Sequence, residues 1–356
     1  MIKVNKNVLK TKPYVASNRT NAKEVKKLDW NECNIPLSDE IQKVFSDAIK
    51  KVNLTEYPPI GNEKLLQKIA EYCGVKKQNV EIFNGSDSAL EYIFSCFVDN
   101  DIDVLIYDPN YTQINNLISL QTEKVHRSQI KNILTEPEYD LSAIKKADVV
   151  YISNPNNPTG YTLEPKLIEK LVAENKSKLF IIDEAYYEFH GKSCCYLAEK
   201  YNNIIVTRTF SKALSLASIR LGYICTDNKN IQIINKIKNK KEVNSFAHAL
   251  GFSALEHIHL FEKRVQIIQQ SREYFLSEMK RMNIECLASE ANFVLVKLRN
   301  HQAALTELLK NKFLVRDRSM FEGLQGCIRI TMDTKDNMKT ISNILEKTEL
   351  RGGQNQ

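Results

Sequence analysis

The pattern of hydrophobic and polar positions predicts two helices after about residue 37, followed by short strands that alternate with helices. "SDEIQKVFSDAIKKV" places Ile41, Val44, Phe45 and Ile49 on one helix face, and "NEKLLQKIAEYCG" is a second amphipathic helix that ends at Gly74. Short apolar segments then alternate with helical patterns such as "SALEYIFSCF" and "EPKLIEKLVAEN". We expect strands at residues 80–83, 103–108, 148–153, 179–183, 204–209 and 221–225.

These strand segments are apolar on both faces, which is typical of a largely parallel sheet covered by helices on both sides. The pattern therefore predicts an α/β protein whose large domain is a three-layer αβα unit. After residue 227 a long helical region leads into a smaller α+β pattern. We expect a polar, irregular N-terminal arm at residues 1–36 that packs near the small domain, a large domain at 37–235 and a small C-terminal domain at 236–356.

Composition narrows the class of partner. The 356 residues carry a net charge of +7, but the lysines are scattered instead of forming a basic stripe with interleaved aromatics, so we predict no nucleic-acid partner. No segment approaches the roughly 20 apolar residues of a membrane span, and the N-terminus lacks the apolar run of a signal peptide. These features favour a cytoplasmic protein that does not bind membranes.

Cysteine and histidine spacing gives no support for a metal site. None of the eight cysteines forms a C-x-x-C pair, which argues against a zinc ribbon or redox motif and favours free thiols. His257 and His259 are two residues apart and do not share a helix face, so we interpret them as a surface pair. We therefore predict no metal.

Two segments with candidate chemistry follow strands, at the edge where open α/β sheets bind ligands. In "FNGSDSALEYIF", Gly85 permits a tight turn before Ser86 and Asp87, which form either an ordinary helix cap or a phosphate seat. In "SNPNNPTGY", the chain forms a rigid turn or directs the Asn157 amide at a ligand. The dinucleotide-binding G-x-G-x-x-G and the P-loop motif are both absent.

Two further segments place charged groups in apolar surroundings. In "LFIIDEAYYEF", Asp183 ends an apolar strand, and a buried carboxylate requires a cationic partner, either a structural side chain or a ligand. "TFSKALSLASIRLGY" contains Ser211, Lys212 and Arg220. Lys212 is either an ion-paired core lysine or a nucleophilic amine, because burial disfavours the charged form of an amine.

Taken in order, these segments resemble the fold-type I pyridoxal-phosphate (PLP) enzymes, the aspartate aminotransferase superfamily, and are most similar to the histidinol-phosphate aminotransferase family. The matching segments also include "NECN", "EYPPIGNEKL", "DPNY", "LVRDRS" and "CIRIT". The resemblance spans roughly residues 30 to 345. It implies the PLP-transferase fold and PLP as cofactor.

The resemblance also implies a role for each matched residue. Lys212 would form a Schiff base with PLP and carry a proton between the substrate α-carbon and the cofactor. Asp183 would pair with the pyridine nitrogen and keep the ring an electron sink. Asn157 and Tyr186 would bind the 3′-oxygen, and Tyr111 would stack on the ring. Lys212, Asp183 and Tyr186 are thus the catalytic candidates.

The phosphate of PLP would be held at the opposite end of the cofactor. The resemblance assigns this role to Ser86 and Asp87, largely through backbone amides, and to Ser211 and Arg220. Tyr57 would reach the same phosphate from a second subunit, which implies a homodimer with shared active sites.

On the substrate side, Arg329 matches the arginine that grips the α-carboxylate, and Arg316 matches a residue that helps to hold a substrate phosphate. Asn31 lies in "WNECNIPLSDE", which departs from the N-E-N-P-Y-G-like pattern of the family in the segment that lines the side-chain pocket. We predict transfer of an amino group from a donor such as glutamate to a small phosphorylated keto or aldehyde acceptor. The alternatives are a PLP decarboxylase of phosphoserine or phosphothreonine, and a non-catalytic regulator on the same fold.

Overall fold

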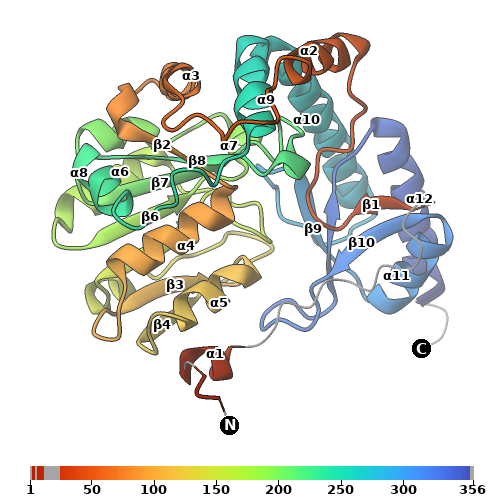
Figure 1. Cartoon of the computed structure of the whole chain (residues 1–356). Helices are drawn as coiled ribbons and strands as arrows, with labels where there is room; N and C mark the ends of the chain where they lie inside the picture. The colour runs from red at the N-terminus through yellow and green to blue at the C-terminus, as the bar shows by residue number, and fades with distance from the viewer. Residues whose placement is uncertain (1, 5, 12–24, 353–356) are drawn as a thin grey trace.

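The computed structural model describes residues 2–4, 6–11 and 25–352, and these build two β-sheets flanked by helices (Figure 1). The larger sheet has the order β2-β8-β7-β6-β5-β3-β4. Strands β3 to β7 are parallel to one another, whereas β8 is antiparallel to β7 and to β2. Its strands are β2 (Val80–Phe83), β3 (Val104–Asp108), β4 (Val125–Gln129), β5 (Val149–Ser153), β6 (Leu179–Asp183), β7 (Ile204–Thr209) and β8 (Gly222–Thr226).

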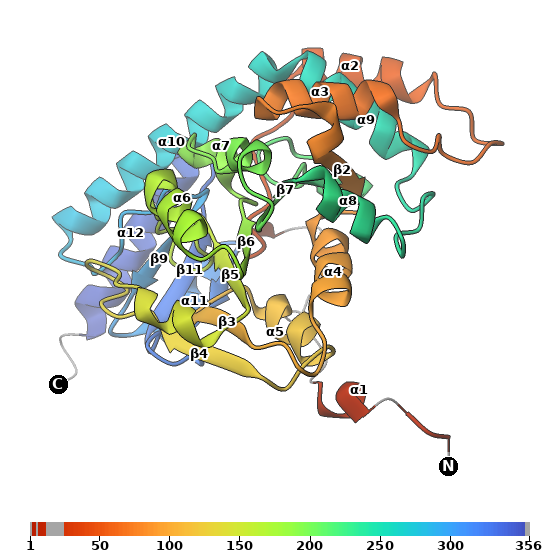
Figure 2. The same ribbon diagram turned by 90° about the vertical axis from the view of Figure 1, so that its left-hand side faces the viewer.

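Side chains alternate between the two faces of this sheet, and each face has its own core. Ile106 and Ile181 pack with helices α4 (Ser86–Phe97) and α5 (Thr112–Ser119) on one face. Leu105 and Ile182 pack on the other face with α3 (Glu63–Cys73) and α6 (Pro165–Glu174). Figure 2 shows α4 and α6 on opposite sides of the sheet. The predicted three-layer αβα architecture is therefore confirmed.

The smaller sheet, of order β1-β10-β11-β9, lies beside the large one. It consists of β1 (Lys26–Leu28), β9 (Phe293–Lys297), β10 (Phe313–Asp317) and β11 (Cys327–Thr331), and it packs with α10 (Ile258–Arg281), α11 (His301–Lys310) and α12 (Lys335–Gly352). Strand β1 runs parallel to β10. The expectation of an irregular N-terminus is thus wrong at two places: residues 26–28 form an edge strand, and Lys6–Lys10 form the short helix α1.

The central helical region contributes to both cores. Helix α9 (Ser245–Glu256) packs against α2 (Asp39–Ile49) and α3, and its residues Ala247 and Ala254 join the core of the large sheet. Helix α8 (Asn228–Ile234) lies beside α4, and α10 packs against α12. The division into residues 1–36, 37–235 and 236–356 stays a prediction.

Two simpler expectations can be compared with the structure. All eight cysteines are free thiols, as predicted. Among the helices of the described residues, none combines the length and the apolar character needed to cross a membrane.

One close backbone contact fixes the start of α4 against the large sheet. A Cβ atom on Gly222 would lie 2.3 Å from the backbone nitrogen of Ser86 and 2.5 Å from the carbonyl carbon of Gly85. Backbone atoms cannot move aside without displacing the whole helix N-terminus. The absence of a side chain at Gly222 therefore sets the position of the first turn of α4.

We expect Gly222→Ala to lower the free energy of unfolding by about 1–3 kcal/mol, because an added methyl group overpacks this contact. Gly251→Ala is the matched control, since its Cβ would meet side-chain atoms and no backbone: the end of Leu221 at 2.3 Å, and Leu65 and Phe210 at an ordinary 3.6 Å. Thermal unfolding followed by scanning calorimetry compares the two variants. A larger loss in Gly251→Ala than in Gly222→Ala would contradict this account.

Candidate active site

A cavity lies at the carboxyl ends of β5, β6 and β7. All the predicted cofactor-binding residues except Tyr57 line it, together with Ser153, Ala185 and Thr209. It adjoins a larger cavity of about 800 Å³ that shares Tyr111, Lys212 and Arg220 among its lining residues. The parallel strands bring segments far apart in the sequence to one edge of the sheet, as expected for an open α/β fold.

Asp183 is the last residue of β6, and its carboxylate is buried. Oδ2 accepts a hydrogen bond of 2.7 Å from the Tyr151 hydroxyl, and Oδ1 accepts one of 3.0 Å from Thr207. Burial raises the pKa of Asp183, and these hydrogen bonds oppose the rise. No lysine or arginine in the described part of the chain forms an ion pair with Asp183, so the cation that this carboxylate requires would come from a ligand.

Lys212 lies in the loop after β7 and is only half-buried. Its Nζ donates a 2.8 Å hydrogen bond to the carbonyl of Trp30 and lies 5.7 Å from the centre of the Tyr186 ring. Within the described residues this amine forms no ion pair with a carboxylate. The structure therefore favours the nucleophilic amine over the ion-paired core lysine.

An anion seat closes the other end of the cavity. Helix α4 begins at Ser86, directly after Gly85, whose φ of 87° is in the left-handed region. The guanidinium of Arg220 donates to Asp87 Oδ2 at 3.1 Å and to Ser211 Oγ at 3.5 Å. Helix N-terminal amides, hydroxyl groups and a guanidinium are the groups that bind phosphate.

Three side chains form a hydrogen-bonded group on the wall next to Lys212. The Tyr186 hydroxyl accepts hydrogen bonds from Asn157 Nδ2 at 3.2 Å and from Asn31 Nδ2 at 2.9 Å. Opposite, the Tyr111 hydroxyl donates to Asp87 Oδ1 at 3.0 Å. Asn31 follows β1, so this group joins the small sheet to the cavity.

Besides Arg220, three further arginines line the larger cavity: Arg316, Arg318 and Arg329. Arg316 and Arg329 are register partners on β10 and β11, and Arg329 is 4% exposed. Arg329 Nη1 donates to Asn157 Oδ1 at 2.6 Å, which links the arginines to the group around Tyr186. A cavity with four guanidinium groups favours anionic substrates.

Some functional side chains were missed from the sequence, and one predicted residue lies elsewhere. Tyr151, Thr207 and Arg318 were not singled out; Arg318 lies just after the end of β10. Tyr57 lines neither cavity: it is 78% exposed, and Lys241 Nζ lies 3.9 Å from the centre of its ring.

The chemistry of these side chains fits PLP. The buried Asp183 requires a cation, Lys212 offers an amine, and the seat around Ser86 and Arg220 suits a phosphate. PLP has a protonatable ring nitrogen, an aldehyde and a phosphate, so each group of the cofactor has a counterpart in the cavity.

The fold and the cavity thus define a PLP-dependent transferase. A family model for aminotransferase class I and II matches residues 23–347, and the chain belongs to this family. It is 34% identical to a dihydroxyacetone phosphate transaminase of Campylobacter jejuni, over 99% of both chains. It is 31% identical to a histidinol-phosphate aminotransferase of Caldanaerobacter subterraneus, over 90% of this chain and 92% of the relative.

The fold comparison agrees. The crystal structure of histidinol-phosphate aminotransferase from Sinorhizobium meliloti in complex with pyridoxal-5′-phosphate superposes with a TM-score of 0.83 at 22% identity, over 92% of each chain. The chain is therefore a PLP-dependent aminotransferase with the fold that the sequence predicts.

Asp183→Asn is expected to retain PLP through Lys212 and the anion seat, but to lower kcat by about a hundredfold or more, or about 2.7 kcal/mol. The physical reason is that a neutral amide does not stabilise a protonated ring nitrogen. Steady-state kinetics of the PLP-loaded variant measures this, with Asp183→Glu as the control that keeps the charge. A kcat equal to that of the unsubstituted enzyme would contradict the role of Asp183.

The affinity of the apoprotein for PLP should fall as the pH decreases through the raised pKa of Asp183, since only the ionised carboxylate pairs with a cation. The loss should begin at a higher pH than an ordinary aspartate would give. Absorbance titrations of the apoprotein with PLP across this range provide the measurement. Asp183→Asn should lack this part of the pH dependence, and an unchanged profile in the variant would overturn the assignment.

Proposed function

We propose that this enzyme transfers an amino group from a carboxylate-bearing donor such as glutamate to a small phosphorylated keto or aldehyde acceptor. The observation that carries the proposal is that Lys212 and four arginines, Arg316, Arg318 and Arg329 as well as Arg220 of the anion seat, line one cavity of about 800 Å³. The two relatives named above are transaminases whose names both specify a phosphorylated compound, which supports a phosphorylated acceptor.

We assign a set of binding residues to each group of the cofactor. Ser86, Ser211 and Arg220 would hold the phosphate, Asp183 the ring nitrogen, and Asn157 with Tyr186 the 3′-oxygen, while Tyr111 would cover the ring. When bound, PLP supplies an electron sink that makes the hydrogen on the substrate α-carbon acidic. The residues of the chain then determine where that proton goes.

Lys212 is the proton carrier in this proposal. Its Nζ lies within the cavity, held at 2.8 Å by the Trp30 carbonyl, and it is not engaged by a carboxylate. The amine can therefore take a proton from the α-carbon and return it to a neighbouring carbon. Trp30 lies two residues after the end of β1 in the small sheet. The position of Lys212 Nζ therefore depends on how the small sheet packs against the large one.

The arginines divide the recognition of substrate between two anionic groups. Arg329, which is buried and bonded to Asn157, would hold the α-carboxylate of the donor by two parallel hydrogen bonds. Arg316 and Arg318 would hold the phosphate of the acceptor. A decarboxylase would use the same cofactor contacts, but the sequence relatives above are transaminases.

We expect Arg316→Ala to raise KM for dihydroxyacetone phosphate by about tenfold or more, since a charge-assisted hydrogen bond contributes about 1.5–3 kcal/mol. The rate at which the absorbance of the PLP form decreases after mixing with glutamate should change little. Arg329→Lys is the matched variant. It should slow the half-reaction with glutamate and leave KM for dihydroxyacetone phosphate little changed. Stopped-flow absorbance of each half-reaction separates the two effects.

Equal effects of both substitutions on both half-reactions would contradict this division. Release of carbon dioxide from phosphoserine or phosphothreonine, without any keto acid, would replace the transaminase proposal with the decarboxylase. Unphosphorylated dihydroxyacetone provides the acceptor control, since it should be insensitive to Arg316→Ala.

We also propose that the active enzyme is a homodimer in the cytoplasm. Tyr57 is exposed and lines neither of the two active-site cavities of its own chain, so it is available to complete the phosphate seat of a second copy. Eight free thiols support a reducing compartment.

Complementation tests the shared site. Tyr57→Ala and Lys212→Ala should each be nearly inactive at limiting PLP. Co-expression should restore about a quarter of the activity, because heterodimers contain one site with both residues intact. Assays of the mixed and the separate variants measure this. Absence of recovery, with heterodimers demonstrated by differential tags, would rule out a contribution of Tyr57 from the second subunit.

A further inference from the structure

Three cysteines from distant parts of the chain meet behind the active site. Cys73 ends α3, Cys195 begins a short 3₁₀ turn at Cys195–Glu199, and Cys225 lies in β8. Their three Sγ atoms all lie within 4.8 Å of one another. The cysteines are separated by 122 and 30 residues (195 − 73 and 225 − 195), so no short spacing motif could reveal the cluster.

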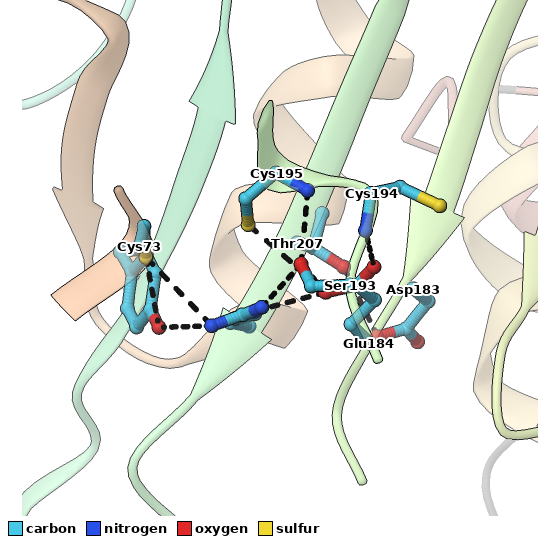
Figure 3. Close-up of polar contacts among 9 residues, drawn as sticks. Cys73, Asp183, Glu184, Ser193, Cys194, Cys195 and Thr207 are labelled. Carbon is cyan, nitrogen blue, oxygen red and sulfur yellow. Dashed lines mark hydrogen bonds and ion pairs between the residues drawn. The ribbon is translucent and has the colours of Figure 1, made fainter. Parts of the chain in front are cut away.

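Adjacent cysteines in the sequence do not all belong to this cluster, as Cys194 and Cys195 show. Figure 3 shows Cys195 directing its sulfur toward the side of Cys73, whereas the sulfur of Cys194 points the other way. Cys195 and Cys225 are buried, and Cys73 is partly exposed. The cluster therefore has one open side, at the end of α3.

A positive charge stands beside the sulfur atoms. Arg208 is 1% exposed, and its Nη1 lies 3.7 Å from Cys73 Sγ. The Tyr223 hydroxyl lies 3.5 Å from the same sulfur. The nearby carboxylate of Glu184 accepts from Arg208 Nε at 2.9 Å and lies 4.0 Å from Cys195 Sγ (Figure 3). A thiolate at Cys73 would be stabilised by the positive charge of Arg208.

The geometry points to a binding site for one thiophilic divalent cation, of the zinc class, held by the Sγ atoms of Cys73, Cys195 and Cys225. Zinc–sulfur bonds of about 2.3 Å place thiolates about 4 Å apart, which is compatible with this cluster. Soft thiolate ligands select such ions. A divalent ion would offset two of the three thiolate charges, and the Arg208 guanidinium, which also pairs with Glu184, lies beside the cluster.

The site would connect three segments that contact the active-site strands. Arg208 lies between Thr207, which hydrogen-bonds Asp183, and Thr209, which lines the PLP cavity. An ion here would bind the folded state and tie α3 and the Cys195 segment to β8. It should therefore raise the unfolding temperature by mass action, without touching substrate or cofactor.

The test uses the PLP-loaded enzyme, freed of metal and kept reduced with a phosphine. Titration with Cd²⁺ should produce a thiolate-to-metal charge-transfer band that saturates at one ion per chain, and Zn²⁺ should displace it and raise the unfolding temperature. Cys195→Ser and Cys225→Ser should each weaken Cd²⁺ binding by at least about a hundredfold.

Cys194→Ser and Cys286→Ser are the matched controls, since neither sulfur belongs to the cluster; both should bind Cd²⁺ like the unsubstituted enzyme. PLP loading and transaminase activity of every variant verify folding. The proposal is overturned if no charge-transfer band forms, if Cys195→Ser binds Cd²⁺ as tightly as the control variants, or if Cys194→Ser loses binding equally.

Discussion

The structure of the site depends on the carboxylate of Asp183, which is buried without a cation from the described residues. The end of β6 holds it in place, and Tyr151 and Thr207 fix both of its oxygens. Burying a carboxylate is costly unless it is paired. This carboxylate lines the same cavity as Lys212 and the anion seat, so a ligand with a cationic group, an aldehyde and a phosphate is the partner that we propose for it.

The small sheet completes this arrangement from the other side. Asn31 and Trp30, which follow β1, contact Tyr186 and Lys212, and Arg329 on β11 contacts Asn157. The residues that we propose for substrate recognition and for cofactor binding are thus joined by hydrogen bonds between the small sheet and the large one. If Arg329 binds the donor carboxylate, its hydrogen bond to Asn157 would link that carboxylate to the side chain that we propose holds the 3′-oxygen of PLP.

The features of the fold that depend on local sequence pattern could be predicted from the sequence. The apolar strands and the polar residues at their ends could be recognised because parallel strands place those ends together. Strand β4 was missed, since "VHRSQ" is a polar, partly exposed edge strand. The cysteine cluster was missed because its members are far apart in the chain. Which polar strand residues support Asp183 depends on side-chain direction, which periodicity does not give.

The central claim is that Lys212 is the amine to which PLP is attached. Borohydride reduction of the PLP-loaded enzyme, followed by proteolysis and mass spectrometry, tests it most directly. The account predicts a pyridoxyl group on the peptide that contains Lys212 and on no other lysine. A pyridoxyl group on another lysine, such as Lys238, or none at all from protein that is catalytically active, would contradict it.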